Sequence, residues 1–582
     1  MPYFPQLSGL KLSKEVLDTF GGYDHNLKSA SGMWYEEQNM TAEHYPLLAT
    51  RKKRGICNTI ADPQGIITKD TLAYVDGADL VYNGYRIDMG LSTAEEMCPK
   101  QMISMGAYLL IWPDKKWLNT VNMTEYGSME ASNTTAADVV VTLCQRDGTA
   151  YADVATTAPE SPSDGALWMD TSGEKPALKK YSTQSSMWVS VPTTYLKLES
   201  AFIGAGMSAG DGVTISGFTG TLASLNGSYI IEDCTEGYIM VIGIMEDTQY
   251  TEKAEVTVCR SVPDMDFVCE SGNRVWGCKY GFVDGKTVNE IYASKLGDFK
   301  NWNVFQGLST DSYVASRGSD GPFTGAIAHL GYPLFWKENC LEKVYPAASG
   351  GHQIVTTECR GVQKGCWRSL KIVGETLYYK SRDGVCAYTG ALPVGVYSAF
   401  GSERYTNARG GALGKRYFVS MADEKGGWHL FTYDTEKRLW HREDATKAMF
   451  FTEKDGELFY IDEETRKLMC VNGTEGTLEG DFEWSVTSGV IGFADSEHKY
   501  LSRFVFRADL APGSCLHMDI RYDEDREWTK RGTYYGAGLR SFVLPVMPRR
   551  CDHLRIRLRG KGDVKVYSMA KIKEKGSDAA WR

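Results

Sequence analysis

A repeated unit of short strand-like segments constrains this sequence more than any other feature. Each unit has a glycine or alanine lead-in, a strand-like run with paired aromatic or apolar residues, a turn, and a second run before a charged turn. The units recur about every 40 residues, the period expected for a four-stranded propeller blade. The central runs of four units are Leu334-Phe335-Trp336, Leu377-Tyr378-Tyr379, Tyr417-Phe418-Val419 and Leu458-Phe459-Tyr460.

The repeat predicts an all-β protein built around a β-propeller. One small antiparallel sheet cannot bury both of its faces, whereas blades stacked around an axis cover one another. We count about seven units, the first of them in residues 56–130 and the remainder in residues 261–481. The 60 glycines, 33 tyrosines and 14 tryptophans agree with this class, because short strands joined by tight turns need turn formers and aromatic residues.

Three further regions flank or interrupt the repeat. Residues 1–55 show little alternation and predict an extended N-terminal arm. Residues 131–260 predict small inserted β-modules, because a loop whose ends already lie close together tolerates insertion. Residues 482–573 contain longer strand-like runs, which predict a C-terminal β-sandwich, and residues 574–582 form a polar tail.

Charge and composition exclude several classes of protein. A net charge of -10 provides no global basic field to attract nucleic acid or an anionic membrane. The apolar runs are far shorter than the roughly 20 residues that span a bilayer, so we expect no membrane insertion. The 14 cysteines include no CxxC pair and the nine histidines are scattered singly, so we expect reduced thiols, no metal site and no cofactor.

Strings that match catalytic motifs lack the structural context that those motifs need. Residues Gly206 to Gly210 fit the GxSxG pattern, but a β-like run follows them where a nucleophile elbow requires a helix. Residues Ser161 to Trp168 partly match the Asp-box of sialidases, which is a structural hairpin. A glycosidase needs two carboxylates held close together, and the sequence nominates no such pair. We therefore predict that the chain is not an enzyme.

Two basic clusters are candidates for contact with phosphate or with an acidic partner. They comprise Arg51, Lys52, Lys53 and Arg54 in one run, and Arg549, Arg550, Arg555, Arg557 and Arg559 near the C-terminus. The last three alternate along one strand-like run and should share a face. Guanidinium groups on such a face suit phosphate or carboxylate. A solvated strand face, a subunit interface and a channel that faces DNA are the three interpretations.

Two tryptophans, Trp168 and Trp188, mark the insertion. In one hypothesis they stack on a sugar of the host cell surface. In the other they cover the small core of the module. Exposure of the ring faces distinguishes the two hypotheses.

Six further stretches of the sequence share features with a known family. They are Phe20 to Asn26, Tyr45 to Gly55, Asn289 to Trp302, Lys499 to Arg503, Ile520 to Asp523 and Pro548 to Arg555. These stretches resemble bacteriophage tail hub or nozzle proteins of the DNA-stabilisation group. The resemblance covers most of the chain apart from the insertion, which is similar to small tryptophan-containing modules of phage fibres and tail tips.

The resemblance implies a structural virion protein of a phage tail that is assembled in the host cytoplasm. It implies a ring of identical subunits, commonly a hexamer, that continues or closes the DNA channel. Portal or adaptor proteins, other tail proteins, tail fibres and packaged DNA are the partners that it suggests. The first alternative is a receptor-binding tail-tip or fibre protein that uses the tryptophan module on host surface glycan. The second is a sialidase-like enzyme that degrades glycan.

Overall fold

The computed structural model describes residues 12–93, 99–245, 248–283, 285–303, 310–347, 351–492, 499–536, 538–545, 549 and 551–575. These residues are nearly all in strands and turns, with three short 3₁₀ helices among them, Gly220–Leu225, Trp367–Ser369 and Ser398–Phe400. The predicted all-β class is confirmed. The chain divides into two compact units, Met1–Asp88 with Phe335–Leu341 and Thr356–Arg582, and Met89–Leu334 with Glu342–Val355.

Seven small antiparallel sheets account for most of the described repeat. The first three are β6–β9 (Pro63–Lys69, Thr71–Asp76, Asp79–Tyr82, Tyr85–Asp88), β10–β13 (Gln101–Met105, Tyr108–Trp112, Lys116–Asn119, Tyr126–Ser128) and β26–β29 (Phe267–Glu270, Val275–Val283, Lys286–Ala293, Tyr313–Ser316). The next three are β30–β33 (Gly325–His329, Tyr332–Trp336, Cys340–Pro346, His352–Glu358), β34–β37 (Lys371–Val373, Thr376–Lys380, Val385–Tyr388, Val394–Gly395) and β38–β41 (Tyr405–Leu413, Arg416–Asp423, Trp428–Asp434, Leu439–Arg442). The seventh contains β42 (Ala448–Lys454), β43 (Glu457–Asp462), β44 (Lys467–Cys470), β5 (Gly55–Thr59) and β45 (Thr477–Leu478).

Tight turns and doubly buried strands explain why the repeat folds into these sheets. Asn83 and Gly84, between β8 and β9, both have positive φ (50° and 79°), as a two-residue hairpin turn requires. In β31, the consecutive residues Leu334, Phe335 and Trp336 are fully buried, so both faces of this strand are covered. The prediction of many small antiparallel sheets is confirmed. Their closure into one seven-bladed ring stays a prediction.

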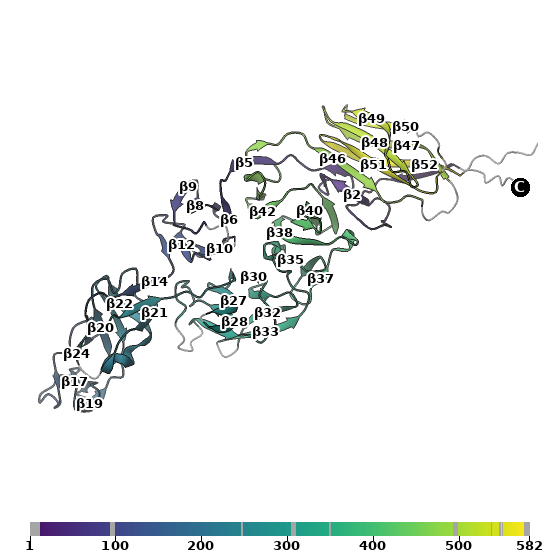
Figure 1. Ribbon diagram of the computed structural model, residues 1–582. Coiled ribbons are helices and arrows are strands. Elements are labelled where there is room, and N and C mark those ends of the chain that lie inside the picture. The colour runs from purple at the N-terminus through teal and green to yellow at the C-terminus, as the bar shows by residue number, and fades with distance from the viewer. Residues whose placement is uncertain are drawn as a thin grey trace, which may run out of the picture. The chain divides into compact units, whose positions relative to one another are not determined.

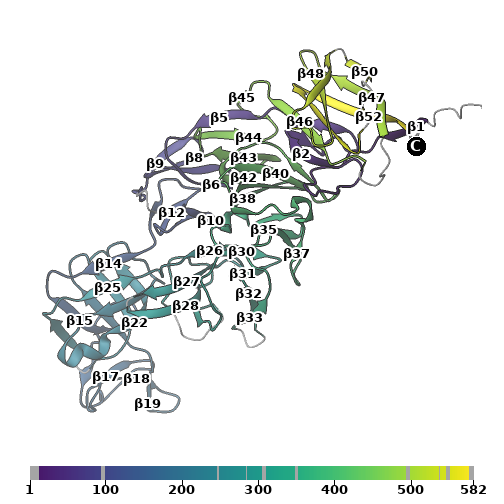
Figure 2. The ribbon, with the colours of Figure 1, turned by 45° about the vertical axis from the view of Figure 1, so that its right-hand side comes forward.

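An N-terminal strand completes the seventh sheet. β5 pairs antiparallel with β44, although more than 400 residues separate them in the sequence, and Figure 2 shows the purple strand beside the green one. The approach is so close that a Cβ on Gly55 would lie 2.6 Å from Sγ of Cys470. Glycine at this position is therefore needed for the pairing.

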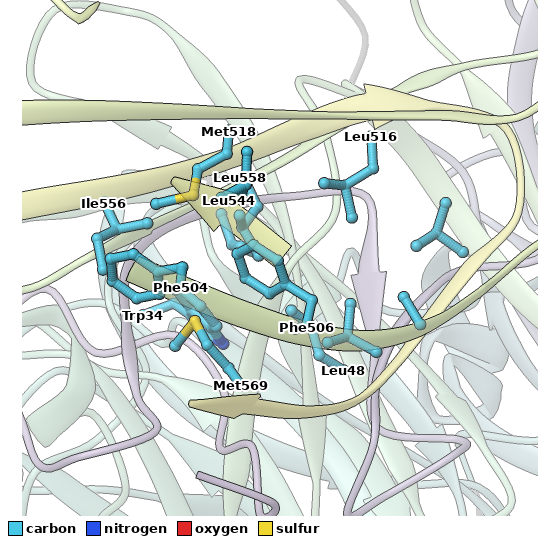
Figure 3. Close-up of a cluster of buried hydrophobic side chains, with 14 of the residues drawn as sticks. Trp34, Leu48, Phe504, Phe506, Leu516, Met518, Leu544, Ile556, Leu558 and Met569 are labelled. Carbon is cyan, nitrogen blue, oxygen red and sulfur yellow. The ribbon is translucent and has the colours of Figure 1, made fainter. Parts of the chain in front are cut away.

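The C-terminal region forms two packed sheets. One contains β2 (Trp34–Gln38), β46 (Glu483–Ser488), β51 (Leu554–Lys561), β48 (Cys515–Tyr522) and β49 (Thr529–Tyr535). The other contains β3 (Met40–Thr41), β4 (Leu48–Thr50), β52 (Val564–Lys575), β47 (Lys499–Leu510), β50 (Gly538–Pro545) and β1 (Leu12–Leu17). Their inner faces share one core, in which Trp34 and Leu48 lie with Phe504, Phe506 and Ile556 (Figure 3).

The predicted extended arm is corrected by this arrangement. Residues 12–50 contribute β1 to β4 to the sandwich, and Figure 1 shows purple β2 beside β46. Trp34 is 2 % exposed and Phe20 stacks on it at 6.3 Å. Burial of such aromatic surface stabilises the pairing of these short strands, which could not persist alone in water. The first 11 residues and the tail from residue 576 lie outside the described residues.

The insertion consists of one module nested inside another. An eight-stranded sheet has the order β14 (Ala131–Thr134), β25 (Thr257–Arg260), β21 (Gly212–Ser216), β22 (Gly227–Thr235), β23 (Tyr238–Ile242), β20 (Tyr195–Glu199), β15 (Val139–Cys144) and β24 (Gln249–Glu252). Between β15 and β20 the chain forms a second sheet of β16 (Val154–Ala155), β17 (Leu167–Asp170), β18 (Ala177–Ser182) and β19 (Met187–Ser190). This second sheet is called the tryptophan module below.

Candidate functional site

The first basic run provides two buried arginines that belong to an ion-pair network. Arg54 forms ion pairs with Glu443 (2.6 Å) and Asp444 (2.8 Å), and its side chain is 3 % exposed. Arg51 pairs with Glu479 at 2.5 Å, and its Nε donates a hydrogen bond to Oδ1 of Asn39 at 2.7 Å. Burial raises the pKa of Asp444, but the charges of Arg54 and Arg51 outweigh it and the pKa is lowered. The hypothesis that these two arginines face phosphate or a partner is wrong.

The two lysines of the same run lie on the surface. Lys52 pairs with Glu43 at 3.3 Å and Lys53 pairs with Asp481 at 2.6 Å. Both lysine side chains are more than two-fifths exposed, so the pairs are solvated and weak. The run therefore presents no concentrated positive patch.

The second basic cluster does form a face on one sheet of the sandwich. Arg555, Arg557 and Arg559 alternate along β51 and point away from the core, because Ile556 and Leu558 between them are fully buried. In the register, Arg555 lies opposite Arg521 of β48, and Arg557 lies opposite Asp519. We define the basic face by the side chains Arg521, Lys530, Arg555, Arg557 and Arg559.

One buried carboxylate and two aromatic rings organise the basic face. Asp519, 1 % exposed, accepts hydrogen bonds from Arg557 and Arg559, each at 2.7 Å. The guanidinium groups of Arg521 and Arg557 lie 5.0 and 4.6 Å from the ring centroid of Trp528. Arg555 lies 4.6 Å from the ring centroid of Tyr35. These contacts fix planar cations in place at small entropic cost.

The electrostatics of the basic face are positive despite Asp519. Burial lowers the pKa of His517, and the nearby charges of Lys530 and Arg559 lower it further. Arg549 lies apart from the face and pairs with Asp525 at 2.5 Å. Arg550 lies outside the described residues. Alternation in the sequence predicted that Arg555, Arg557 and Arg559 share a face, as they do. It missed Arg521 and Lys530, because only the strand register brings these two residues beside the three arginines.

The tryptophan module gives its two rings different environments. Trp168 is 6 % exposed, donates from Nε1 to the carbonyl of Ala155 (3.0 Å), and has Nζ of Lys179 at 4.9 Å from its ring. Trp188 is only partly buried and packs edge-on against Trp168 and Tyr181, with centroid distances of 5.4 and 5.3 Å. Trp168 is therefore a core residue, while Trp188 keeps an accessible part of its ring.

An open pocket of about 710 Å³ lies in the larger unit, at a place that sequence reasoning missed. Its walls come from the N-terminal segment and from the sheets β34–β37 and β38–β41. The aromatic lining residues are Tyr23, Tyr378, Tyr433 and Trp440, and the charged ones are Asp24 and Arg438. We call this cavity the aromatic pocket. The paired aromatic residues of the repeat could have indicated a pocket, but from the sequence they predicted only packing between blades.

The described part of the chain offers no group of three or more His, Cys, Asp or Glu side chains that could hold a metal ion. In the same residues, no helix has the length and apolar character needed to cross a membrane.

Comparison with known proteins gives similarity to solved structures. No family model and no curated protein matches the chain. An exo-β-1,3-galactanase from Phanerochaete chrysosporium has 8% identity, covering 52% of this chain and 95% of that one, with a TM-score of 0.20. AztD from Citrobacter koseri has 10% identity, with coverages of 74% and 93% and a TM-score of 0.27. A glycoside hydrolase family 43 arabinoxylan arabinofuranohydrolase from Bacillus subtilis has 8% identity, coverages of 66% and 93%, and a TM-score of 0.14.

These matches correct one prediction. We expected a chain that is not an enzyme, and that expectation is contradicted because glycosidases stand among the similar structures. Similarity at these TM-scores transfers no reaction, substrate or catalytic residue to this chain.

Proposed function

We propose that the chain is a ring-forming hub or nozzle subunit of a bacteriophage tail, attached to its neighbours through the basic face. The observation that carries the proposal is this ordered face of five basic side chains on a chain whose net charge is -10. The sequence resemblance described above supports the same function. Portal or adaptor proteins and tail fibres are the further partners that this role requires.

Charge complementarity favours an identical subunit as the first partner of the basic face. Because the five residues of the face are cationic, the remainder of the chain is more acidic than the net charge indicates. We propose that acidic side chains elsewhere on a second copy meet the basic face of the first. Contact between two different patches on identical subunits is head-to-tail, and it generates a ring when the rotation closes. Such complementarity also directs the correct pairing during assembly.

The location of the chain in particles tests this function. Particles purified from bacteria that express the gene from its natural genome would be labelled with an antibody against the full chain and viewed by electron microscopy. We expect label at the tail, below the capsid. Particles that lack the chain, or label on the capsid shell alone, would contradict the proposal.

The second candidate function is recognition of host surface glycan by the tryptophan module. It is favoured by Trp188, whose ring is partly exposed beside the exposed side chain of Met187. Aromatic rings of this kind stack on sugar faces. Binding of the full chain to host cells should fall with Trp188→Ala and stay unchanged with the matched variant Met187→Ala. Equal binding by both variants would exclude this use of the module.

Glycan cleavage is the remaining candidate. Hydrolysis of a glycosidic bond needs two carboxyl groups in most families, and Asp24 is the one carboxylate among the described residues that line the aromatic pocket. Release of reducing sugar from capsular polysaccharide by the full chain, abolished by a single acidic substitution, would establish the activity.

A further inference from the structure

The aromatic pocket has a rigid wall. The ring of Tyr433 lies 5.9 Å from Tyr378 and 4.8 Å from Trp440, measured between centroids. Trp440 donates from Nε1 to the carbonyl of Val396 at 2.7 Å, which fixes its orientation. Tyr378 and Tyr433 are each 6 % exposed and Trp440 is 2 % exposed, so the rings form a fixed wall but offer no open face on which a sugar could stack.

Hydroxyl groups surround this wall. Thr376, Thr389, Ser398 and Thr435 line the pocket with the aromatic residues. Burial raises the pKa of both Tyr378 and Tyr433, so their phenol groups remain protonated at neutral pH. Hydroxyls both donate and accept hydrogen bonds, as the hydroxyl groups of a sugar require of their partners.

The two charged side chains of the pocket differ in how they are engaged. Oδ1 of Asp24 accepts two hydrogen bonds from Asn26, one from Nδ2 (2.5 Å) and one from the backbone N–H of Asn26 (3.2 Å). Arg438 is exposed, and its backbone adopts the left-handed conformation (φ 55°). It forms no ion pair with any described residue. Its neighbours in the turn are paired, Lys437 with Asp434 at 2.9 Å and Glu436 with Lys415. Neither charge has an ion-pair partner among the described residues, but Asp24 is engaged by hydrogen bonds from Asn26, so Arg438 is the charge available to an anionic ligand.

We propose that the aromatic pocket binds an acidic saccharide, with the sugar hydroxyls on the threonine and serine side chains that line the pocket and the sugar carboxylate on Arg438. A single guanidinium suits a single carboxylate, to which it can donate two parallel hydrogen bonds. A dianionic phosphate ester is less well matched, since Asp24 adds a negative charge to the lining. The site is separate from both the basic face and the tryptophan module, so its existence does not depend on the proposed tail function.

Ligand-observed saturation-transfer NMR on the full chain tests this site. The probes are methyl β-glucuronide and its neutral counterpart, methyl β-glucoside. We expect transfer to the glucuronide, and affinity weaker by roughly tenfold or more both for the glucoside and for the glucuronide with Arg438→Gln, which is the loss expected for charge-assisted hydrogen bonds.

Arg466→Gln is the matched control. Arg466 is also exposed and also lies in a turn with a left-handed backbone conformation (φ 58°). This turn joins β43 to β44, and Arg466 does not line the pocket. This variant should bind the glucuronide as the wild type does. The proposal is overturned if the wild type gives no transfer to the glucuronide, if both probes bind equally, or if both arginine variants lose binding equally.

Discussion

Arg51 and Arg54 lie in a run that resembles the C-terminal basic cluster in sequence, yet the two regions are organised in opposite ways. The two arginines before β5 contact three carboxylates, Glu443, Asp444 and Glu479. On β51, Arg557 and Arg559 share one carboxylate, Asp519, while Arg555 contacts the ring of Tyr35. The ratio of carboxylates to arginines, together with burial, separates a structural ion-pair network from a surface that has positive charge available for a partner.

The largest expected effect comes from breaking the buried network. Arg54→Ala leaves Glu443 and Asp444 without their main cation, and loss of one partner from a buried ion pair costs about 3–5 kcal/mol. Urea unfolding of the larger unit should show this loss. Lys53→Ala is the control, because an exposed pair contributes at most about 1 kcal/mol. A loss for Arg54→Ala no larger than for Lys53→Ala would contradict the comparison.

A smaller loss is expected at the carboxylate beneath the basic face. Asp519→Asn preserves the shape of the side chain but weakens its charge-assisted hydrogen bonds from Arg557 and Arg559. We expect about 1.5–3 kcal/mol of destabilisation, because the acceptor is buried while the two guanidiniums keep access to water. Urea unfolding at neutral pH measures it, and a loss as large as that of Arg54→Ala would show that the basic face is also a structural network.

The pH dependence of stability should depend on the same carboxylate. Burial raises the pKa of Asp519, but hydrogen bonds from Arg559 and Arg557 outweigh it, and the pKa is lowered. Since the unfolded pKa is about 3.9, the contribution is complete above about pH 5 and is lost as pH falls through the folded-state pKa. Unfolding midpoints from pH 6 down to pH 2.5 should therefore decrease less steeply in Asp519→Asn than in the wild type. Identical acid profiles would contradict the assignment.

The smallest effect on stability is expected at Arg555. Its guanidinium contacts the ring of Tyr35 and is partly exposed, so Arg555→Ala should cost no more than about 1 kcal/mol. The thermal unfolding midpoint measures this change. A cost near that of Arg54→Ala would remove the distinction between the two regions.

Sequence reasoning succeeded where structure is decided locally and was wrong where it is decided by distant partners. Turns such as Asn83-Gly84 and the doubly buried run around Phe335 carry their structure in adjacent residues. The burial of Arg54 depends on Glu443, 389 positions away, and β2 depends on a partner strand beyond residue 480. The aromatic pocket was missed for the same reason, since its wall and its charged residues come from three separate segments.

The association state of the full chain tests most directly the claim that the basic face is an interface. Native mass spectrometry and sedimentation at low salt should show a cyclic oligomer of roughly six copies for the wild type. Arg555→Glu should shift the chain to monomers that remain folded, whereas Lys52→Glu, a charge reversal in the other cluster, should leave the oligomer intact. A monomeric wild type at high concentration, or an oligomer that Arg555→Glu leaves unchanged, would contradict the account.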